Sequence, residues 1–209
     1  MNDFEDENGT ARAELLQRLE LMECMIAEGR RSVTRCGWIF VLWGLVDFAG
    51  YGWEYYLPQS TWRWAWPVCL TAGAIITVIG SMLQKRRDGS SKSMQCRSLD
   101  AVWGMMGVTL ALYVGTALMT HFSWQYSYVS ALLMIVGMAH GISAVLLRWR
   151  AQGIVAAIWW AGGVAILFCN SHRATDDIFL LEMCFGMIVF GLYAMILEHR
   201  GGGWGHANG

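Results

Sequence analysis

Charged side chains are scarce in this sequence: Asp, Glu, Lys and Arg together make up 15% of its 209 residues. Soluble domains average about 25% charged residues, whereas 56% of this chain is hydrophobic. So little polar surface excludes an ordinary water-soluble fold and predicts an integral membrane protein in contact with the lipid bilayer. The formal net charge is -1 and no basic patch carries interleaved aromatic residues, which argues against nucleic-acid binding.

Catalytic and metal-binding motifs are also missing. The six cysteines form no CxxC pair and no Cys/His cluster with zinc spacing, so we interpret them as free thiols used as small apolar residues. The sequence contains no HExxH motif and no P-loop. Its histidines are expected at different depths, which argues against a haem held between two of them. We therefore predict no enzymatic activity, no metal and no other cofactor.

Long apolar runs are what the sequence has instead. A helix needs about 20 predominantly apolar residues to cross a bilayer. The chain has six such runs, at about 37–57, 65–83, 101–120, 128–147, 153–170 and 178–197. The only two prolines, Pro58 and Pro67, flank the turn between the first two runs, where a missing N–H is tolerated. The predicted fold class is therefore an all-α integral membrane protein with six transmembrane helices.

The distribution of Lys and Arg between the loops predicts the orientation. If the N-terminus is inside, 13 of the 15 basic residues fall in the inner segments, and only Arg63 and Arg173 fall in the outer loops. Cytoplasmic loops are enriched in Lys and Arg, so we expect both termini in the cytoplasm and the chain in the plasma membrane, as in a bacterial inner membrane. The acidic N-terminus lacks the features of a secretory signal peptide, so the first span is expected to be an uncleaved anchor.

An amphipathic helix is predicted before the first span. Its apolar residues follow one narrow stripe with helical spacing, at Leu15, Leu19, Met22 and Ile26. The stripe is either a seam for a partner or a face that rests on the membrane surface. A partner bound through 11–32 would be a second copy or a larger membrane complex. The expected segments are a disordered acidic tail at 1–10, the cytoplasmic helix at 11–35, the transmembrane domain at 36–200 and a disordered Gly-rich tail at 201–209.

The six spans are expected to pair as three tandem hairpins. Each hairpin ends in a basic cluster: QKRR at 84–87, LRWR at 147–150 and LEHR at 197–200. Glycines recur at matching places in the hairpins, as Gly44 and Gly107 do, which favours a repeated hairpin unit. In the fourth span, Gly137 and Gly141 form a GxxxG motif, which lets two helix backbones approach closely.

This arrangement resembles the HdeD-type acid-resistance membrane proteins of bacteria. The resemblance is one of architecture over residues 37–200: three hairpins, both termini inside, basic hairpin ends and Gly-rich helices. It implies a stress-related membrane protein, and it supplies no established catalytic residues. The N-terminal amphipathic helix, the many tryptophans and the few loop prolines depart from the family pattern.

Four ionisable residues fall within the predicted spans: Asp47, Glu54, His140 and Glu182. Such groups are expensive in the bilayer and usually face the bundle interior with partners. Counted from the span ends, Asp47 and His140 share the midplane, and Glu54 and Glu182 share a shallower level. Asp47 and Glu54 lie seven residues apart on one helical face, about 10 Å along the axis. The four residues form either a polar path for protons or cations, or a structural hydrogen bond between Asp47 and His140 with Glu54 and Glu182 reaching the outer water.

Two functions are therefore open. The first is a non-enzymatic membrane scaffold, accessory protein or stress-related regulator that acts through the N-terminal helix. The alternative is a small proton- or cation-linked transporter or channel that uses a midplane Asp47–His140 pair. We favour the scaffold, because four ionisable residues are few for a dedicated pathway.

Overall fold

The computed structural model describes residues 3–88, 94–120, 126–169 and 171–202. Within these ranges the chain forms helices and short connections, with no β-strand. In chain order the helices are α1 (Asp3–Arg35), α2 (Gly37–Tyr56), the short η1 (Gln59–Thr61), α3 (Trp62–Asp88), α4 (Met94–Thr120), α5 (Tyr126–Leu147), α6 (Arg150–Cys169), α7 (His172–Glu182), η2 (Met183–Val189) and α8 (Phe190–Gly202). Six helical stretches are long and apolar enough to cross a membrane. The all-α, multi-pass membrane class predicted from the sequence is confirmed.

Helical structure extends beyond the apolar runs that predicted the spans. α3 and α4 contain 27 residues each, more than the roughly 20 that a bilayer requires. α1 begins at Asp3, so residues 3–10 form its first turns and not the disordered tail that was expected. Acidic residues favour a helix N-terminus because they complement its dipole. Residues 1–2 and 203–209 of the two predicted tails lie outside the described part of the chain.

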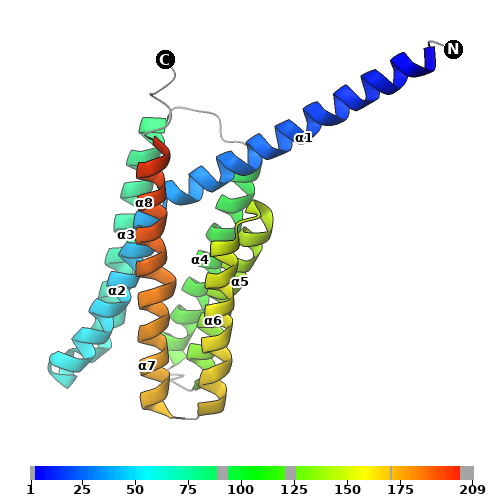
Figure 1. The fold of residues 1–209 in the computed structure, drawn as a ribbon. Coiled ribbons are helices and arrows are strands. Elements are labelled where there is room, and N and C mark those ends of the chain that lie inside the picture. Colours follow the sequence, from blue (N-terminus) through cyan, green and yellow to red (C-terminus); the bar gives the residue numbers. More distant parts are fainter. Residues whose placement is uncertain (1–2, 89–93, 121–125, 170, 203–209) are drawn as a thin grey trace.

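The last membrane stretch runs through α7, η2 and α8 without a break (Figure 1). Its middle part, η2, is a π-helical turn of seven residues. Such turns are rare inside α-helices and are frequent at functional sites. The turn lies between Glu182 and Phe190, two residues that face the centre of the bundle.

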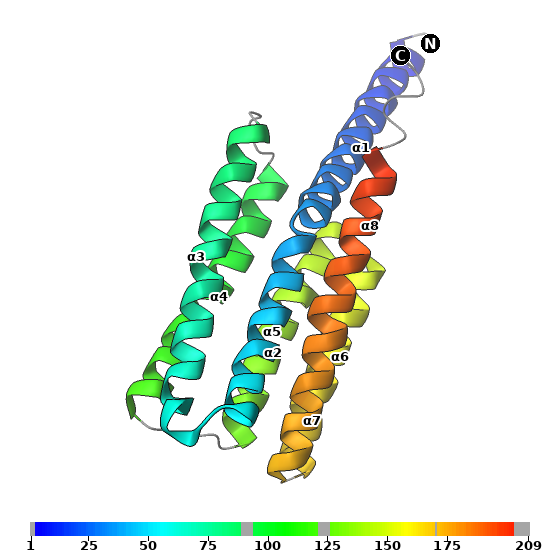
Figure 2. The same cartoon turned by 90° about the vertical axis from the view of Figure 1, so that its left-hand side faces the viewer.

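Contacts between helices are uneven. Consecutive helices touch in the pairs α2–α3, α4–α5 and α6–α7, but the most extensive contact joins α5 to α6, which belong to different predicted hairpins. α2 also packs against α8 and η2. α3 lies at the edge of the bundle beyond α2 (Figure 2). Many large apolar side chains on α3 and α4 are exposed, among them Ile75, Ile79, Met105 and Leu112, as expected for faces in contact with lipid.

α1 leaves the bundle obliquely, and its N-terminal end lies far from the other helices (Figure 1). The base of α1 is anchored: the guanidinium group of Arg30 donates hydrogen bonds to the carbonyl oxygens of Leu147 (2.8 Å) and Arg148 (2.7 Å). Val33 and Thr34 are buried in the same region. We call the end of the bundle that carries this anchor the α1 end.

Candidate functional site

His140 of α5 lies at the centre of the bundle and is fully buried. Four aromatic rings surround its imidazole ring, with centroid distances of 5.0 Å to Trp103, 5.3 Å to Phe190, 5.5 Å to Phe40 and 6.4 Å to Trp159. These rings come from α4, α8, α2 and α6. Neither Nδ1 nor Nε2 of His140 has a hydrogen-bond partner among the described residues.

His140 is one of five buried polar residues with unpaired atoms. We call them the polar row: Gln152, Ser143, His140, Trp159 and Glu182. Seven of their side-chain nitrogen and oxygen atoms are buried and find no partner in the described part of the chain. Four of these residues have no exposed surface, and Glu182 is 5% exposed. Buried polar atoms normally have partners, so such a concentration in one region needs an explanation.

The energies involved are large. A buried polar atom left without a hydrogen bond costs about 1–3 kcal/mol. Seven such atoms would cost roughly 7–20 kcal/mol, whereas the whole stability of a typical protein is about 5–15 kcal/mol. This cost marks the polar row as the candidate site for a bound polar group.

Close contacts at glycines hold Trp159 and Glu182 in place. A Cβ atom added at Gly186 would lie 2.5 Å from Nε1 of Trp159, and one added at Gly162 would overlap the Glu182 carboxylate. Gly162 is one turn along α6 from Trp159, and Gly186 is one turn along from Glu182. Any larger residue at either glycine would displace a member of the polar row.

Asp47 does not belong to the row. It lies on α2, is half-buried, and forms no hydrogen bond or ion pair with another described residue. The ring that meets His140 is that of Phe40, seven residues or about 10 Å from Asp47 along α2. The structure therefore forms no hydrogen bond between Asp47 and His140.

Glu54 and Glu182 also contact different neighbours. Oε1 of Glu54 accepts a hydrogen bond of 2.9 Å from Nε1 of Trp66 in α3, whereas the Glu182 carboxylate lies against Gly162 of α6. Tyr51, which is one turn before Glu54, lies near Asp176 of α7. Glu54 thus pairs with α3, whereas Asp47 forms no hydrogen bond with another described residue.

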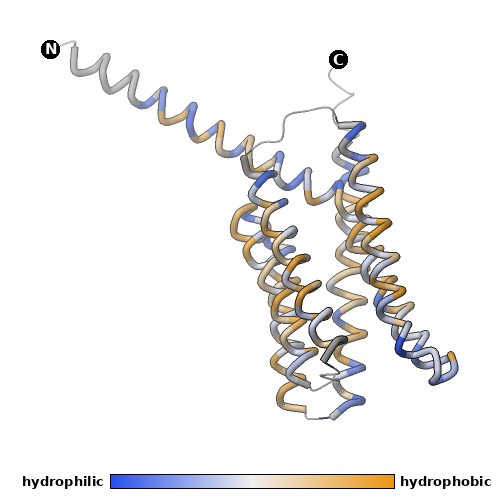
Figure 3. The backbone as a smooth tube through the Cα atoms, turned by 180° about the vertical axis from the view of Figure 1, so that it is seen from behind, coloured by the Kyte–Doolittle hydropathy of each residue, from blue (hydrophilic) through white to orange (hydrophobic). Residues whose placement is uncertain are grey.

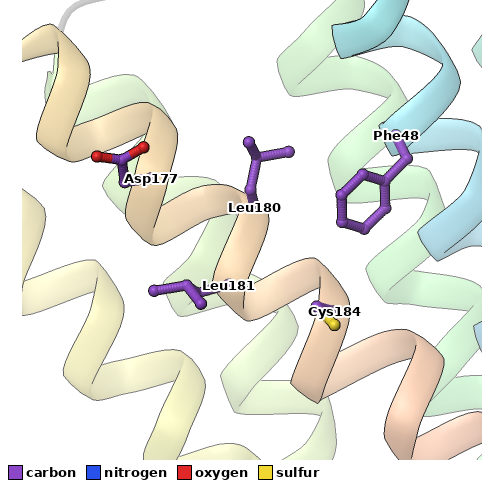
Figure 4. A pocket seen from close by; sticks show the side chains of 5 residues that line it. All are labelled: Phe48, Asp177, Leu180, Leu181 and Cys184. Atoms are coloured by element: carbon purple, nitrogen blue, oxygen red, sulfur yellow. The ribbon is translucent and has the colours of Figure 1, made fainter.

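An open groove of about 560 Å³ lies between α2 and the α7–η2 segment (Figure 4). Its lining is apolar except for one carboxylate, and consists of Phe48, Asp177, Leu180, Leu181 and Cys184. None of the four predicted ionisable residues lines it. The groove therefore gives no direct access to Asp47 or His140.

The GxxxG glycines lie in the contact between α5 and α6. Added Cβ atoms would meet the Trp160 indole at 2.6 Å from Gly137 and at 3.0 Å from Gly141. The space beside these two glycines is filled by an aromatic ring and not by the backbone of a second helix. Close approach of two backbones occurs elsewhere: a Cβ atom at Gly37 would lie 2.8 Å from the carbonyl oxygen of Gly191, and one at Gly191 would lie 2.7 Å from that of Gly37.

The apolar stripe on α1 is uncovered. Leu15 is 61% exposed, Leu19 54% and Met22 51%, and their neighbours Leu16 and Leu21 are also exposed. Figure 3 shows hydrophobic and hydrophilic residues mixed along α1, whereas the bundle helices carry long hydrophobic stretches. Ile26, nearer to the bundle, is half-buried. The seam predicted from the sequence is thus open over its distal part.

Three members of the polar row were not selected from the sequence: Ser143, Gln152 and Trp159. These three residues carry no charge, whereas the sequence pattern pointed to ionisable groups within the spans. Gln152 had a usable signal, because an amide in the first turn of an apolar helix is unusual. Among the described residues no group of three or more His, Cys, Asp or Glu side chains could hold a metal ion.

The chain was compared with known proteins in three ways. No protein-family model matches it, and no curated protein and no solved structure matches it either. The likeness to HdeD-type proteins therefore remains one of predicted architecture. Function must be argued from the site geometry alone.

Proposed function

We propose that this protein is a self-associating membrane scaffold, in which α1 binds α1 of a second copy. The observation that carries the proposal is the row of large apolar side chains at 15, 16, 19, 21 and 22, each at least 51% exposed on a helix that leaves the bundle. In the orientation predicted from the basic residues, both termini and α1 lie in the cytoplasm. The six spans, arranged as three hairpins, anchor the scaffold in the plasma membrane.

The spacing of the stripe suits another helix. Leu15, Leu19 and Met22 are separated by four and then three residues, the spacing of a coiled-coil seam. Charged residues of both signs flank them, including the ion pair between Arg18 and Glu14. A helix that lies on a membrane usually carries a broad apolar face and basic flanks. The mixed charges therefore favour a protein partner.

The magnitude fits a weak dimer that depends on concentration. Full burial of a Leu or Met side chain contributes about 1.5–3 kcal/mol, so covering the exposed halves of Leu15, Leu19 and Met22 contributes roughly 3 kcal/mol per copy. Two copies reach about 6 kcal/mol, which exceeds the lower end of the 4–15 kcal/mol cost of association. The Arg30 anchor fixes the direction of α1 before binding, which lowers the cost of ordering it.

The proposal is tested by the molecular mass of the detergent-solubilised protein, measured by light scattering over a range of concentrations. The seam variant replaces Leu15, Leu19 and Met22 by Ser. The control variant makes three Ser substitutions on the polar face of α1, at Gln17 and Glu20 and at Glu28. We expect a dimer for the wild type and the control, and a monomer for the seam variant.

Two results would contradict self-association. One is a monomeric wild type at every concentration, and the other is a seam variant that remains dimeric. If the wild type is monomeric and an isolated 11–32 peptide binds lipid vesicles, α1 is a membrane-surface helix. The alternative function is a small proton- or cation-linked transporter or channel built on Asp47 and His140. We rank it second, because these two residues form no hydrogen bond with each other.

A further inference from the structure

The polar row offers a binding site that is independent of α1. Four of its members belong to α5 and α6, the two helices in most extensive contact, and Glu182 meets Gly162 of α6 from the α7–η2 junction. Gln152 lies in the first turn of α6, directly after the α5–α6 turn whose carbonyl oxygens bind Arg30. The row therefore begins at the α1 end of the bundle.

From there the row continues toward the middle of the bundle. Ser143 and His140 are one turn apart on α5, and the imidazole ring of His140 stacks on Trp159 at an interplanar angle of 14°. Glu182 follows at Gly162, one turn beyond Trp159. From Gln152 to Gly162 is ten residues of α6, or about 15 Å, which is about half of the 30 Å hydrocarbon core.

We propose that this row binds a chain of water molecules, which reaches from the α1 end of the bundle to the carboxyl group of Glu182. A buried water molecule needs two to four polar partners. The row supplies donors at Trp159 and Gln152 and acceptors at Glu182 and Gln152, and the two nitrogens of His140 supply one of each. Ser143 can act as either.

The consequence is access of protons to the middle of the bundle. A proton that leaves the carboxyl group of Glu182 binds to an adjacent water oxygen, and the reverse transfer restores the O–H bond. Carboxyl and imidazole groups joined in this way form the proton relays of membrane proteins. Phe40, Trp103 and Phe190 enclose His140 with aromatic rings and separate the row from lipid.

The first test is reactivity of a cysteine placed in the row. Thiols react as thiolates, which require water. In a chain whose six native cysteines are replaced by Ala, Ser143→Cys is compared with Ala194→Cys. Ser143 and Ala194 are both small and fully buried, but Ala194 lies in α8 outside the row. The probe is hydrogen peroxide, a reagent little larger than water, and the loss of free thiol is followed over time.

We expect Ser143→Cys to react at least tenfold faster than Ala194→Cys. Equal protection of the two cysteines would overturn the proposal, because the polar atoms would then pair among themselves. Equal reactivity of the two cysteines would also overturn the proposal, because it would indicate general loosening of the bundle.

The second test needs no substitution in the measured protein. The indole N–H of Trp159 gives a resolved NMR signal, which is assigned by its loss in Trp159→Phe. Despite full burial of the ring, we expect this proton to exchange with deuterium from heavy water at least tenfold faster than the backbone amides of α6. An N–H that stays protected as long as the backbone amides of α6 would refute the proposal even if Ser143→Cys failed to fold.

Discussion

The crossing of α2 and α8 gives the sharpest test of the packing. Gly37 and Gly191 face each other there, and a Cβ atom on either one would lie 2.7–2.8 Å from the carbonyl oxygen of the other. Backbone atoms in two packed helices cannot move aside as a flexible side chain can. We therefore predict that Gly191→Ala separates α8 from α2 and destabilises the protein.

The magnitude follows from two opposing terms. Replacing Gly by Ala in a helix stabilises it by about 0.8–1.0 kcal/mol, whereas overpacking a tight contact costs about 1–3 kcal/mol. The first term also applies to Gly104→Ala in α4, where an added Cβ atom meets nothing within 4 Å. The difference between the two variants is therefore the overpacking cost alone, about 1–3 kcal/mol.

The assay is thermal unfolding of both variants and the wild type in the same detergent. One kcal/mol shifts the midpoint of a protein of this size by about 2–4 °C, so the two midpoints should differ by roughly 2–12 °C. Gly104→Ala should unfold at or above the wild-type temperature, and Gly191→Ala below that of Gly104→Ala. If the two variants shift equally, α2 and α8 do not touch at these glycines and the arrangement of α8 is wrong.

Three further predictions rest on single contacts and use the same unfolding assay. Arg30→Ala should lower stability by about 1–2 kcal/mol, because its two hydrogen bonds to the α5–α6 turn are charge-assisted. The control Arg18→Ala breaks only an exposed ion pair and should cost less than about 0.5 kcal/mol. Equal losses of stability in the two variants would contradict the role of Arg30 as an anchor. Arg148→Gly should raise stability by up to about 1 kcal/mol, because Arg148 has a φ of 48° that disfavours a side chain, and a decrease would contradict this reason. Ser130→Ala should lose about 1 kcal/mol with its buried hydrogen bond of 2.7 Å to the Gly163 carbonyl oxygen, whereas Thr109→Ala, whose exposed hydroxyl bonds within its own helix, should be nearly neutral.

The helices were predictable because the bilayer imposes a simple rule on each of them separately. Every span had to be helical and about 20 residues long, so its apolar run located it. The α5–α6 turn was placed well: α5 ends at Leu147, as expected, and α6 begins at Arg150. The helix ends in water were not predictable in this way, since hydropathy says nothing about where α1 or α3 stops.

Contacts between helices were less predictable, because glycine is ambiguous. The GxxxG pair of Gly137 and Gly141 received Trp160, and the close backbone crossing fell at Gly37 and Gly191, which form no such motif. A glycine in a helix shows only that there is room for a close neighbour. Whether a backbone, an indole ring or nothing fills the space depends on which helices are neighbours, and a single sequence does not contain that information.

The placement of His140 opposite Asp47 failed for a related reason. Depth was counted from the ends of each span, as if all spans started at the same height. In the structure the α5–α6 turn is tied to Arg30, seven residues before α2 begins. His140, seven residues from Leu147, therefore lies level with Phe40 near the start of α2, and Asp47 lies about two turns farther along. Such anchors set the heights of helices relative to one another. The partners of a buried polar group must therefore be sought among residues at the same height in the bundle, whether or not they are charged. For His140 these are Ser143, Gln152 and Trp159, and water is the ligand that suits them all.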